Sequence, residues 1–409
     1  MTAPQLLAYI AVAIAIQLAA GLGVAFWRWQ RARPISFASA GEARSLLAPA
    51  WRGWREFQVT QRVAEDVSGS QCSFSMRPVD RTPLPTYLPG QFLTFDVPVA
   101  DASSGSGAVT RCYSLSDKPV ADGYRVTIKR ALAPPSAPDA PPGVASTYFH
   151  DVVRVGHVLR AKAPSGQFCL DPDPRIPSIL IAGGVGITPM ISMLLWANAE
   201  QPGRAMYLYY GVRNSADHAF RNILESLAAA NSNFHLTVVY ERPLPADVEG
   251  RDYQHSGYID LELLSLASPA GVRCKYYVCG PPPMMASLVP ALRTSGVPGA
   301  DIHFEAFGPA SLETAKRRPR SALAEPIDVR FERSKRSLMW DGLDATLLDF
   351  AERKGIAMES GCRSGSCGTC ETRIVSGAIR NTQAGGYEVA AGHCLPCISE
   401  PRSALVLDA

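Results

Sequence analysis

Three cysteines in one short segment constrain the fold of this chain more than any other feature. Cys362, Cys367 and Cys370 stand in a C-x4-C-x2-C spacing, and Cys397 follows further on. Thiolates on such a loop wrap a [2Fe–2S] cluster, and small residues between them let backbone N–H groups approach the sulfurs. Structural zinc usually pairs two C-x2-C units or adds histidines, which fits the four-residue gap poorly. The spacing predicts an iron–sulfur domain whose fourth ligand is Cys394 or Cys397.

Length and charge limit the remaining possibilities. A chain of 409 residues is long enough for two or three domains of ordinary size. Its 40 Lys and Arg residues exceed its 37 Asp and Glu residues only slightly, so charge predicts no nucleic-acid partner. The cysteines outside the cluster loop are scattered, which favours a reduced protein that faces the cytosol.

The N-terminal end is free of charge from Met1 to Trp27, and residues 6–26 are almost entirely apolar. As a helix this stretch would span about 30 Å, the thickness of a bilayer core. A cleaved signal peptide would need basic residues before the apolar stretch, and here they all follow it. We therefore predict an anchor with its basic flank at 1–33 and a juxtamembrane segment at 34–52. The positive-inside rule places the soluble domains in the cytoplasm, below the inner membrane.

Two soluble domains follow, and their sequences show different hydrophobic patterns. Residues 53–174 carry short alternating segments cut by Gly and Pro, such as Tyr124–Arg130 with its period of two, which predicts an antiparallel β-barrel. Residues 175–310 carry apolar runs separated by helix-length segments, which predicts a parallel α/β sheet. The four runs expected as strands are 178–184, 206–212, 234–241 and 275–280.

The rest of the sequence predicts a linker and a third domain. Residues 311–325 are polar and basic without an apolar face, as in an inter-domain linker. The cysteine cluster lies in the domain that remains, at 326–409. Another stretch, 131–142, is rich in Pro and Ala and predicts a surface loop.

Two motifs in the first soluble domain resemble the ferredoxin–NADP reductase superfamily. Arg-Cys-Tyr-Ser at 111–114 resembles its R-x-Y-S motif, and Gly-Val-Ala-Ser at 143–146 resembles its G-x-x-S helix start. An arginine neutralises flavin phosphate, an aromatic ring covers the isoalloxazine, a hydroxyl reaches its N5 edge, and a helix N-terminus receives pyrophosphate. The resemblance assigns flavin binding to Arg111, Tyr113 and Ser114, supported by Lys129, Gly143 and Ser146.

Three motifs in the second soluble domain point to a nicotinamide coenzyme. A glycine-rich turn at 181–189 lies between an apolar strand and a helix, where phosphates can reach the helix N-terminus. A Cys-Gly-Pro turn at 279–281 forms the other lip of the crevice and in this superfamily flanks the nicotinamide. Residues 303–309 resemble the end of the reductase half of flavohaemoglobins, where Glu and Phe close over the flavin. The residues assigned in this way are Gly183, Gly184, Gly186, Thr188, Pro189, Cys279, Gly280, Pro281, Met284, Glu305 and Phe307.

The order of domains is similar to that of the phthalate dioxygenase reductase family, with a β-grasp ferredoxin domain last. In plant-type ferredoxins the last ligand stands four residues before a proline, which matches Cys397 and Pro401 and leaves Cys394 as a bystander. The flavin motifs look more like the flavohaemoglobin type, which implies FAD rather than FMN. No globin precedes them, so no haem is expected.

These resemblances imply hydride transfer from NADH or NADPH to FAD, followed by single electrons through the [2Fe–2S] cluster. Ser114 would hydrogen-bond the flavin, while Thr188, Cys279 and Glu305 would shape the stack as the catalytic residues. The expected acceptor is a membrane-associated oxygenase or desaturase, held in the same plane by the anchor. Two alternatives are a non-catalytic redox sensor and the reductase subunit of a respiratory complex.

The choice between NADH and NADPH depends on the end of the second strand of the nucleotide domain. Cations or hydroxyls there receive a 2′-phosphate, whereas a carboxylate repels it and can bind a free 2′-hydroxyl. This chain offers Arg213 and Ser215 but also Asp217. We expect a preference for NADH, with Arg213 turned away from the ribose or bonded to Asp217.

Deleting residues 1–33 is expected to give a soluble reductase that keeps its full flavin and cluster colour, because every motif above follows Arg55. The distribution between membrane pellet and supernatant checks this, with the visible spectrum as the measure of cofactor content. A shortened protein that stays with the membranes would move the anchor to the Trp- and Arg-rich segment at 50–55.

Overall fold

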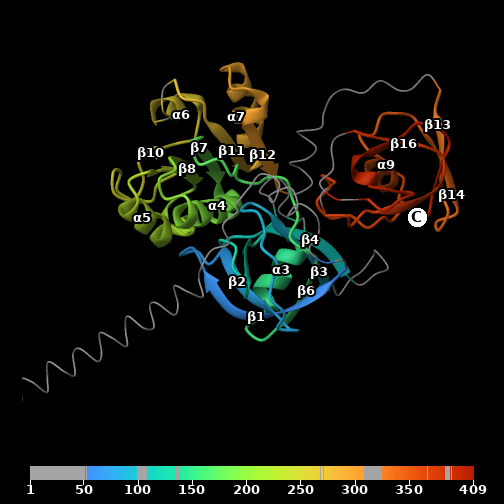
Figure 1. Cartoon of the computed structure of the whole chain (residues 1–409), viewed down its shortest axis with the longest axis horizontal. Helices are drawn as coiled ribbons and strands as arrows, with labels where there is room; N and C mark the ends of the chain where they lie inside the picture. Colours follow the sequence, from blue (N-terminus) through green and yellow to red (C-terminus); the bar gives the residue numbers. More distant parts are fainter. Residues whose placement is uncertain are drawn as a thin grey trace, which may run out of the picture. The chain divides into compact units, whose positions relative to one another are not determined.

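A computed structural model of the chain gives three folded regions (Figure 1). It describes residues 51, 53–98, 108–133, 139, 141–267, 269, 271–307, 325–365, 367–382, 387 and 389–409. The membrane helix predicted over 6–26 and nearly all of the predicted linker lie outside these residues. Within the described part, no helix has the length and apolar character needed to cross a bilayer.

The first region is a six-stranded antiparallel sheet with the order β4-β3-β6-β1-β2-β5. The sheet closes on itself, because Leu115, just beyond β4, pairs with Val126 of β5. This confirms the predicted antiparallel barrel. Its elements are β1 (Arg55–Ala64), β2 (Gln71–Pro78), β3 (Phe92–Pro98), β4 (Ala108–Ser114), β5 (Tyr124–Lys129), helix α3 (Val144–Asp151) and β6 (Val158–Ala161).

Aromatic side chains fill the centre of the barrel. Phe149 of α3 meets Phe74 of β2 and Phe95 of β3 edge to face, with ring centroids 5.3 and 5.4 Å apart. It also meets Tyr113 of β4 at 5.3 Å. Such pairs stabilise a core by more than their buried area alone. Phe149 therefore fixes α3 against the strand that carries the predicted flavin motif.

The second region is a six-stranded parallel sheet with the order β10-β9-β8-β7-β11-β12. The four predicted strands are confirmed to within one residue at each end, because strands covered on both faces are continuous apolar runs. The strands are β7 (Ser178–Gly183), β8 (Met206–Val212), β9 (Phe234–Tyr240), β10 (His255–Ser256), β11 (Lys275–Gly280) and β12 (Ile302–Ala306). The helices are η1 (Gly184–Gly186), α4 (Ile187–Glu200), η2 (Ser215–Asp217), α5 (Arg221–Ala230), α6 (Leu261–Ala267), α7 (Pro282–Thr294) and η3 (Gly299–Asp301).

The strand order reverses at β7. This strand pairs in parallel with β8 on one side and with β11 on the other. The connections on the two sides of β7 therefore run in opposite directions. This arrangement opens a crevice above the carboxyl end of β7. Helices cover both faces, with α4 and α5 in one core and α6 and α7 in the other. The predicted glycine turn and Cys-Gly-Pro turn follow β7 and β11, the two strands beside this crevice.

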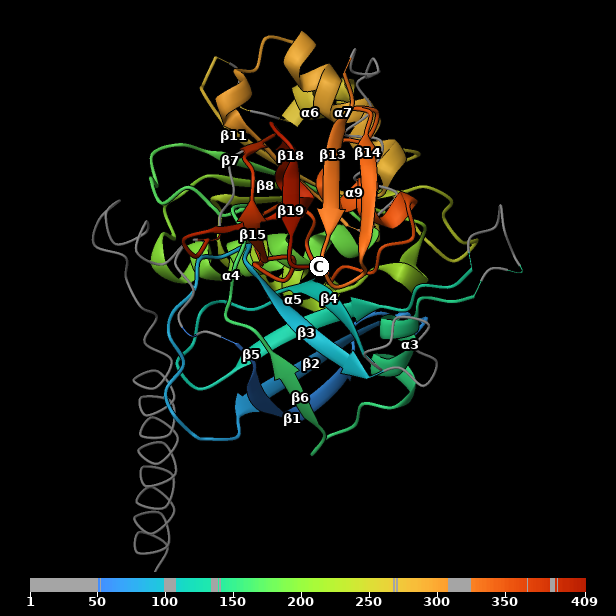
Figure 2. The same ribbon diagram turned by 90° about the vertical axis from the view of Figure 1, so that its right-hand side faces the viewer.

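The third region is a mixed five-stranded sheet with the order β14-β13-β19-β15-β17, beside a two-stranded sheet of β16 and β18. Figure 2 shows β13 and β14 side by side, and their pairing is antiparallel, whereas β13 and β19 are parallel. The elements are β13 (Ile327–Phe331), β14 (Arg336–Trp340), α9 (Leu347–Arg353), β15 (Thr372–Ser376), β16 (Ile379–Asn381), β17 (His393–Cys394), η4 (Pro396–Ile398), β18 (Ser399–Pro401) and β19 (Leu405–Leu407).

Helix α9 packs across this sheet as the helix of a β-grasp fold does. Its Phe350 contacts Phe331 of β13 and Trp340 of β14. The helix begins at Thr346, whose hydroxyl accepts a hydrogen bond from the N–H of Asp349 at 3.2 Å. A cap of this kind stabilises a helix by about 1 kcal/mol. The predicted α+β class of the last domain is confirmed.

Candidate functional site

The glycine turn after β7 packs so tightly against the turn after β11 that side chains are excluded. A Cβ atom at Gly186 would lie 2.1 Å from the carbonyl oxygen of Cys279. A Cβ atom at Gly183 would lie 2.6 Å from the ring of Pro281. Gly184 adopts a φ of +53°, which an L side chain rarely takes. Glycine at these positions therefore lets the two turns pack backbone against backbone beside the crevice.

The helix that follows this turn presents its N-terminus to the crevice. Helix α4 has Gly186 at its N-cap, and no side chain caps it. The Thr188 hydroxyl donates to the carbonyl of Val185 at 3.0 Å, so it fixes the turn. Uncapped N–H groups at a helix N-terminus bind anions well. The residues of this turn therefore fit the pyrophosphate of a dinucleotide.

Glu305 lies at the centre of the candidate site. It stands beside Cys279 in the pairing of β12 with β11; the Cys279 side chain is buried and that of Glu305 is half-buried. Burial raises the pKa of Glu305 to about 8, and the nearby Cys362 thiol adds to this, while the Ser114 hydroxyl opposes it. The carboxyl is therefore neutral at pH 7. Ser114, Glu305 and Cys362 come from the three different domains.

Two buried oxygens at this point are the Ser114 hydroxyl oxygen and Oε2 of Glu305. Apart from the effect of the Ser114 hydroxyl on the Glu305 carboxyl, they have no hydrogen-bond partner among the described residues. Buried polar atoms without a partner are rare in folded proteins and commonly belong to a ligand site. The two atoms fit a polar ring edge such as that of a flavin.

The predicted flavin residues occupy one end of the barrel. Tyr113 is half-buried beside Phe149, whereas Arg111 is exposed and donates to the carbonyl of Thr110 at 2.8 Å. Lys129 ends β5, and its Nζ lies 3.8 Å from the place of a Cβ at Gly184. The barrel therefore brings a cation to the glycine turn of the next domain.

Gly143 and Ser146 fix the start of α3 to the end of β5. The Ser146 hydroxyl donates to the carbonyl of Gly143 at 2.8 Å and accepts from the N–H of Ala131 at 3.1 Å. A Cβ at Gly143 would lie 2.8 Å from that of Ala131. The motif therefore orients the helix N-terminus, and the serine hydroxyl is already engaged with the backbone.

The four predicted cluster ligands lie in two pairs. The sulfurs of Cys370 and Cys397 are 3.2 Å apart, and the thiols of Cys362 and Cys367 interact. The N–H of Cys362 points at the sulfur of Cys367 at 3.3 Å. A two-iron cluster takes two thiolates at each iron, so the pairs fit its ligand set. In the described residues no three His, Cys, Asp or Glu side chains surround one ion position.

Cys394 and Cys397 have different surroundings. Cys394 belongs to the core beneath α9 with Trp340 and Phe350, while Cys397 packs with Cys370. The sulfur-to-sulfur distance favours Cys397 as the fourth ligand, and the assignment stays a prediction.

Tyr387 covers the cluster loop from outside. Its ring is so close to Gly368 that a Cβ there would lie 2.2 Å from it. Its hydroxyl donates to Glu371 at 3.0 Å, and its N–H donates to the carbonyl of Gly365 at 3.1 Å. The tyrosine holds the loop in shape and shields it from water.

Sequence reasoning missed several residues between the barrel and the cluster loop. The Cys112 thiol of β4 interacts with Cys367, and Lys162 donates to the Thr369 hydroxyl at 3.3 Å. Lys162 also lies over the ring of Trp54, 5.0 Å from its centroid. Cys112 stands at the variable position of the R-x-Y-S motif, which was a usable signal. No sequence signal pointed to Lys162, because its contact with Thr369 forms only in the folded chain.

Comparisons with known proteins agree with this site. Residues 180–289 match the oxidoreductase NAD-binding domain family, and residues 331–402 match the 2Fe-2S iron-sulfur cluster binding domain family. Phthalate dioxygenase reductase, "a modular structure for electron transfer from pyridine nucleotides to [2Fe-2S]", shares 25% sequence identity with this chain. That structure covers 87% of this chain and 98% of its own, with a TM-score of 0.52. The chain therefore combines an oxidoreductase NAD-binding domain with a 2Fe-2S iron-sulfur cluster binding domain.

Other relatives match a little under two thirds of the chain. A flavohemoprotein of Rhizobium meliloti (strain 1021) is 38% identical over 265 residues, 64% of this chain and 62% of that protein. The flavohem-like FAD/NAD binding domain of nitric oxide dioxygenase from Vibrio cholerae O1 biovar El Tor is 29% identical, with a TM-score of 0.54. It covers 63% of this chain and 100% of its own. The chain spans 62% and 64% of the length of two flavohemoproteins that it matches.

Replacing Cys397 with serine should abolish the [2Fe–2S] absorption and EPR signal of this chain, because the pair with Cys370 loses one thiolate. Flavin content should stay unchanged. The matched control is Cys394→Ser. Cys394 is three residues from Cys397 in the sequence, but its thiol belongs to the core beneath α9, so this variant should leave the signal intact. Loss of the signal in the control instead would reverse the ligand assignment.

Gly186→Ala should raise KM for the nicotinamide coenzyme at least tenfold, because the new methyl group collides with the backbone of Cys279. Overpacking against backbone typically costs about 1–3 kcal/mol. Gly203→Ala is the control, since nothing lies within 4 Å of a Cβ there. Steady-state kinetics with ferricyanide measure both variants, and equal KM values would show that the turn tolerates a side chain.

Proposed function

We propose that this chain is a membrane-tethered reductase that takes hydride from NAD(P)H onto FAD and passes single electrons through its own [2Fe–2S] cluster to an acceptor protein. The observation that carries the proposal is the contact between the barrel and the cysteine loop, where Lys162 donates to the Thr369 hydroxyl at 3.3 Å. When bound, the flavin accepts a hydride and the cluster carries one electron at a time.

The nucleotide domain supplies binding and orientation. The glycine turn admits the pyrophosphate to the N-terminus of α4, and Lys129 adds a positive charge from the barrel. Cys279 and Gly280 line the other side of the crevice, where Met284 packs against the glycine turn at Gly183. These contacts favour one placement of the coenzyme, which is the main contribution that a protein makes to hydride transfer.

Glu305 would act as a hydrogen-bond donor in its protonated form. Burial raises the pKa of its carboxyl to about 8, which favours the protonated form at neutral pH. A negative carboxylate would repel electrons that arrive nearby, whereas the neutral acid can donate to an electron-rich ring edge. The Ser114 hydroxyl offers a second polar group on the barrel side.

The contacts between barrel and cluster loop support an internal route for electrons. Lys162 binds Thr369, whose hydroxyl in turn meets the sulfur of Cys367 at 3.3 Å. Cys112 reaches the same sulfur from β4, two residues away from Ser114. These bonds would hold the cluster beside the flavin end of the barrel.

FAD is favoured by the relative from Vibrio cholerae, whose name includes an FAD/NAD binding domain. The acceptor that we propose is a membrane-associated oxygenase or desaturase in the inner membrane. The anchor expected at 6–26 would keep both proteins in one plane and raise their effective concentration, with the soluble domains in the cytoplasm.

The test compares two electron acceptors with the full chain in detergent, loaded with flavin and cluster. Cytochrome c accepts one electron from the cluster, and ferricyanide accepts electrons from the flavin directly. We expect Cys397→Ser to lose at least tenfold in NADH:cytochrome c activity and to keep its NADH:ferricyanide activity, because only the first route needs the cluster.

Cys394→Ser is the control and should keep both activities. An unchanged cytochrome c rate in Cys397→Ser would remove the cluster from the route. Turnover of the wild-type chain well below about 1 per second, the low end for enzymes, would favour a redox sensor instead.

A further inference from the structure

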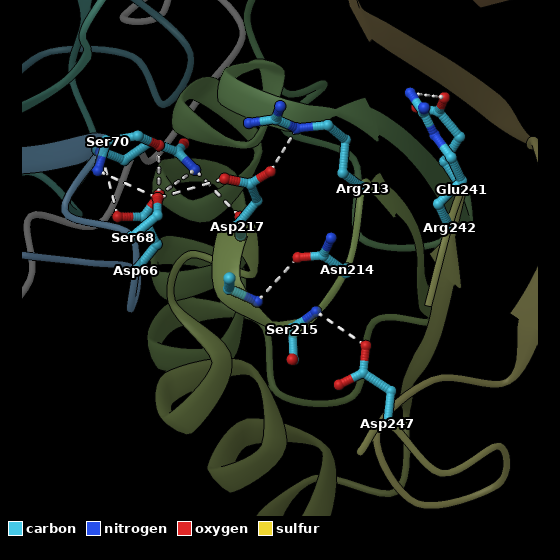
Figure 3. A network of polar contacts seen from close by, with 12 residues as sticks. Asp66, Ser68, Ser70, Arg213, Asn214, Ser215, Asp217, Glu241, Arg242 and Asp247 are labelled. Atoms are coloured by element: carbon cyan, nitrogen blue, oxygen red, sulfur yellow. Dashed lines mark hydrogen bonds and ion pairs between the residues drawn. The ribbon is translucent and has the colours of Figure 1, made fainter. Parts of the chain in front are cut away.

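A polar network joins the end of β8 to a hairpin of the barrel (Figure 3). Arg213 follows β8, and its Nε donates to Oδ2 of Asp217 at 2.5 Å. The pair bears out the expectation that Arg213 binds Asp217. The arginine side chain is 58% exposed and the aspartate side chain only 8%, so the carboxylate is the buried partner.

Asp217 is held from the barrel as well. The Ser68 hydroxyl lies 3.2 Å from Oδ1 of Asp217, and Nε2 of Gln71 donates to its backbone carbonyl at 3.2 Å. Ser68 lies in the connection between β1 and β2, and Gln71 is the first residue of β2. The carboxylate therefore has a partner on each oxygen, one from each domain.

The hairpin that carries Ser68 is itself rigid. Asp66 accepts hydrogen bonds from the Ser70 hydroxyl and from Nε2 of Gln71. It shares the single proton of the Ser68 hydroxyl with Asp217. Two backbone hydrogen bonds join the hairpin to the nucleotide domain. The N–H of Ser68 donates to the carbonyl of Ala216, and the N–H of Phe220 donates to the carbonyl of Glu65. Asp217 cannot turn away from Arg213 without breaking contacts that belong to the junction of two domains.

The position of this pair gives it a role with the coenzyme. In a parallel sheet of this kind the ribose of the adenosine lies beyond the carboxyl end of the second strand. Here that strand is β8, and Arg213 is the first residue after it. A 2′-phosphate would need the guanidinium, because a phosphate is bound best by an arginine fork. A free 2′-hydroxyl needs no cation.

We infer that Asp217, placed beside Ser68 of the flavin domain, sets a preference for NADH by pairing the charge of Arg213 and by placing a carboxylate next to any 2′-phosphate. The pair engages the Nε edge of Arg213, so a phosphate that met the remaining guanidinium N–H groups would lie close to the negative charge of Asp217, which repels it. The inference rests on the proposed function, because it assumes that this edge binds the adenosine end of the coenzyme. Asp217 is a positioning residue that acts through Arg213.

The experiment measures kcat/KM for NADH and NADPH with ferricyanide, using the full chain. Wild type should prefer NADH. Asp217→Asn keeps the shape of the side chain but frees the guanidinium, and it should raise kcat/KM for NADPH about tenfold, about 1.4 kcal/mol, mainly through KM. Adding Arg213→Ala should remove this gain. Ser68→Ala should move the ratio in the same direction by less.

The control is Glu225→Gln, which neutralises the carboxylate of another Arg–acid pair with the same i,i+4 spacing, Arg221–Glu225 on α5. It should leave the NADPH:NADH ratio within twofold of wild type. An equally large rise in this control would mean that net charge is responsible, and the inference would fail. A wild-type preference for NADPH that Arg213→Ala removes would also overturn it.

Calorimetric binding of ADP and of adenosine 2′,5′-bisphosphate separates this inference from the proposed function, since it requires no turnover. Asp217→Asn should gain affinity about tenfold for the bisphosphate alone. If ADP binds and the bisphosphate gains nothing, only the inference about Asp217 is wrong. If neither nucleotide binds wild type or variant, the nucleotide site and the inference fail together.

Discussion

The close approach of the backbone at Gly186 to the carbonyl of Cys279 is the contact on which the rest of the site depends. It brings the ends of β7 and β11 together at the point where the strand order reverses. Because β12 pairs with β11, Glu305 then stands beside Cys279 at the same end of the sheet. Lys129 of the barrel reaches the glycine turn from the other side. A single packing requirement thus places groups from two domains around one crevice.

Most of the fold could be predicted because its signals are local. Strands buried on both faces, such as 178–183 and 275–280, must be continuous apolar runs, and such runs are visible in the sequence. The barrel was harder, since only 124–129 shows a clear period of two, while β4 is half-exposed along most of its length. The cysteine spacing identified its loop directly, because three ligands lie within nine residues of chain.

The contacts between domains could not be predicted, since no local pattern encodes them. Lys162 and Thr369 are 207 residues apart, and Ser68 and Asp217 are 149 apart. Each pair meets only after the strands have found their register and the domains have packed. Arg213 and Asp217 are the exception, because they are only four residues apart and the short turn that ends at η2 brings their side chains together. That ion pair was foreseen, whereas its anchorage by Ser68 was not.

The position of β19 in the last domain has a consequence for biogenesis. This strand lies between β13 and β15 in the sheet, yet it follows all four cluster cysteines in the sequence. A ribosome releases the chain from its N-terminus, so the ligand loop emerges before the strand that completes the sheet beneath it. Iron and sulfide delivered during translation would meet an open, partly folded loop. The sheet that supports the ligand loop is therefore complete only after β19 has been synthesised.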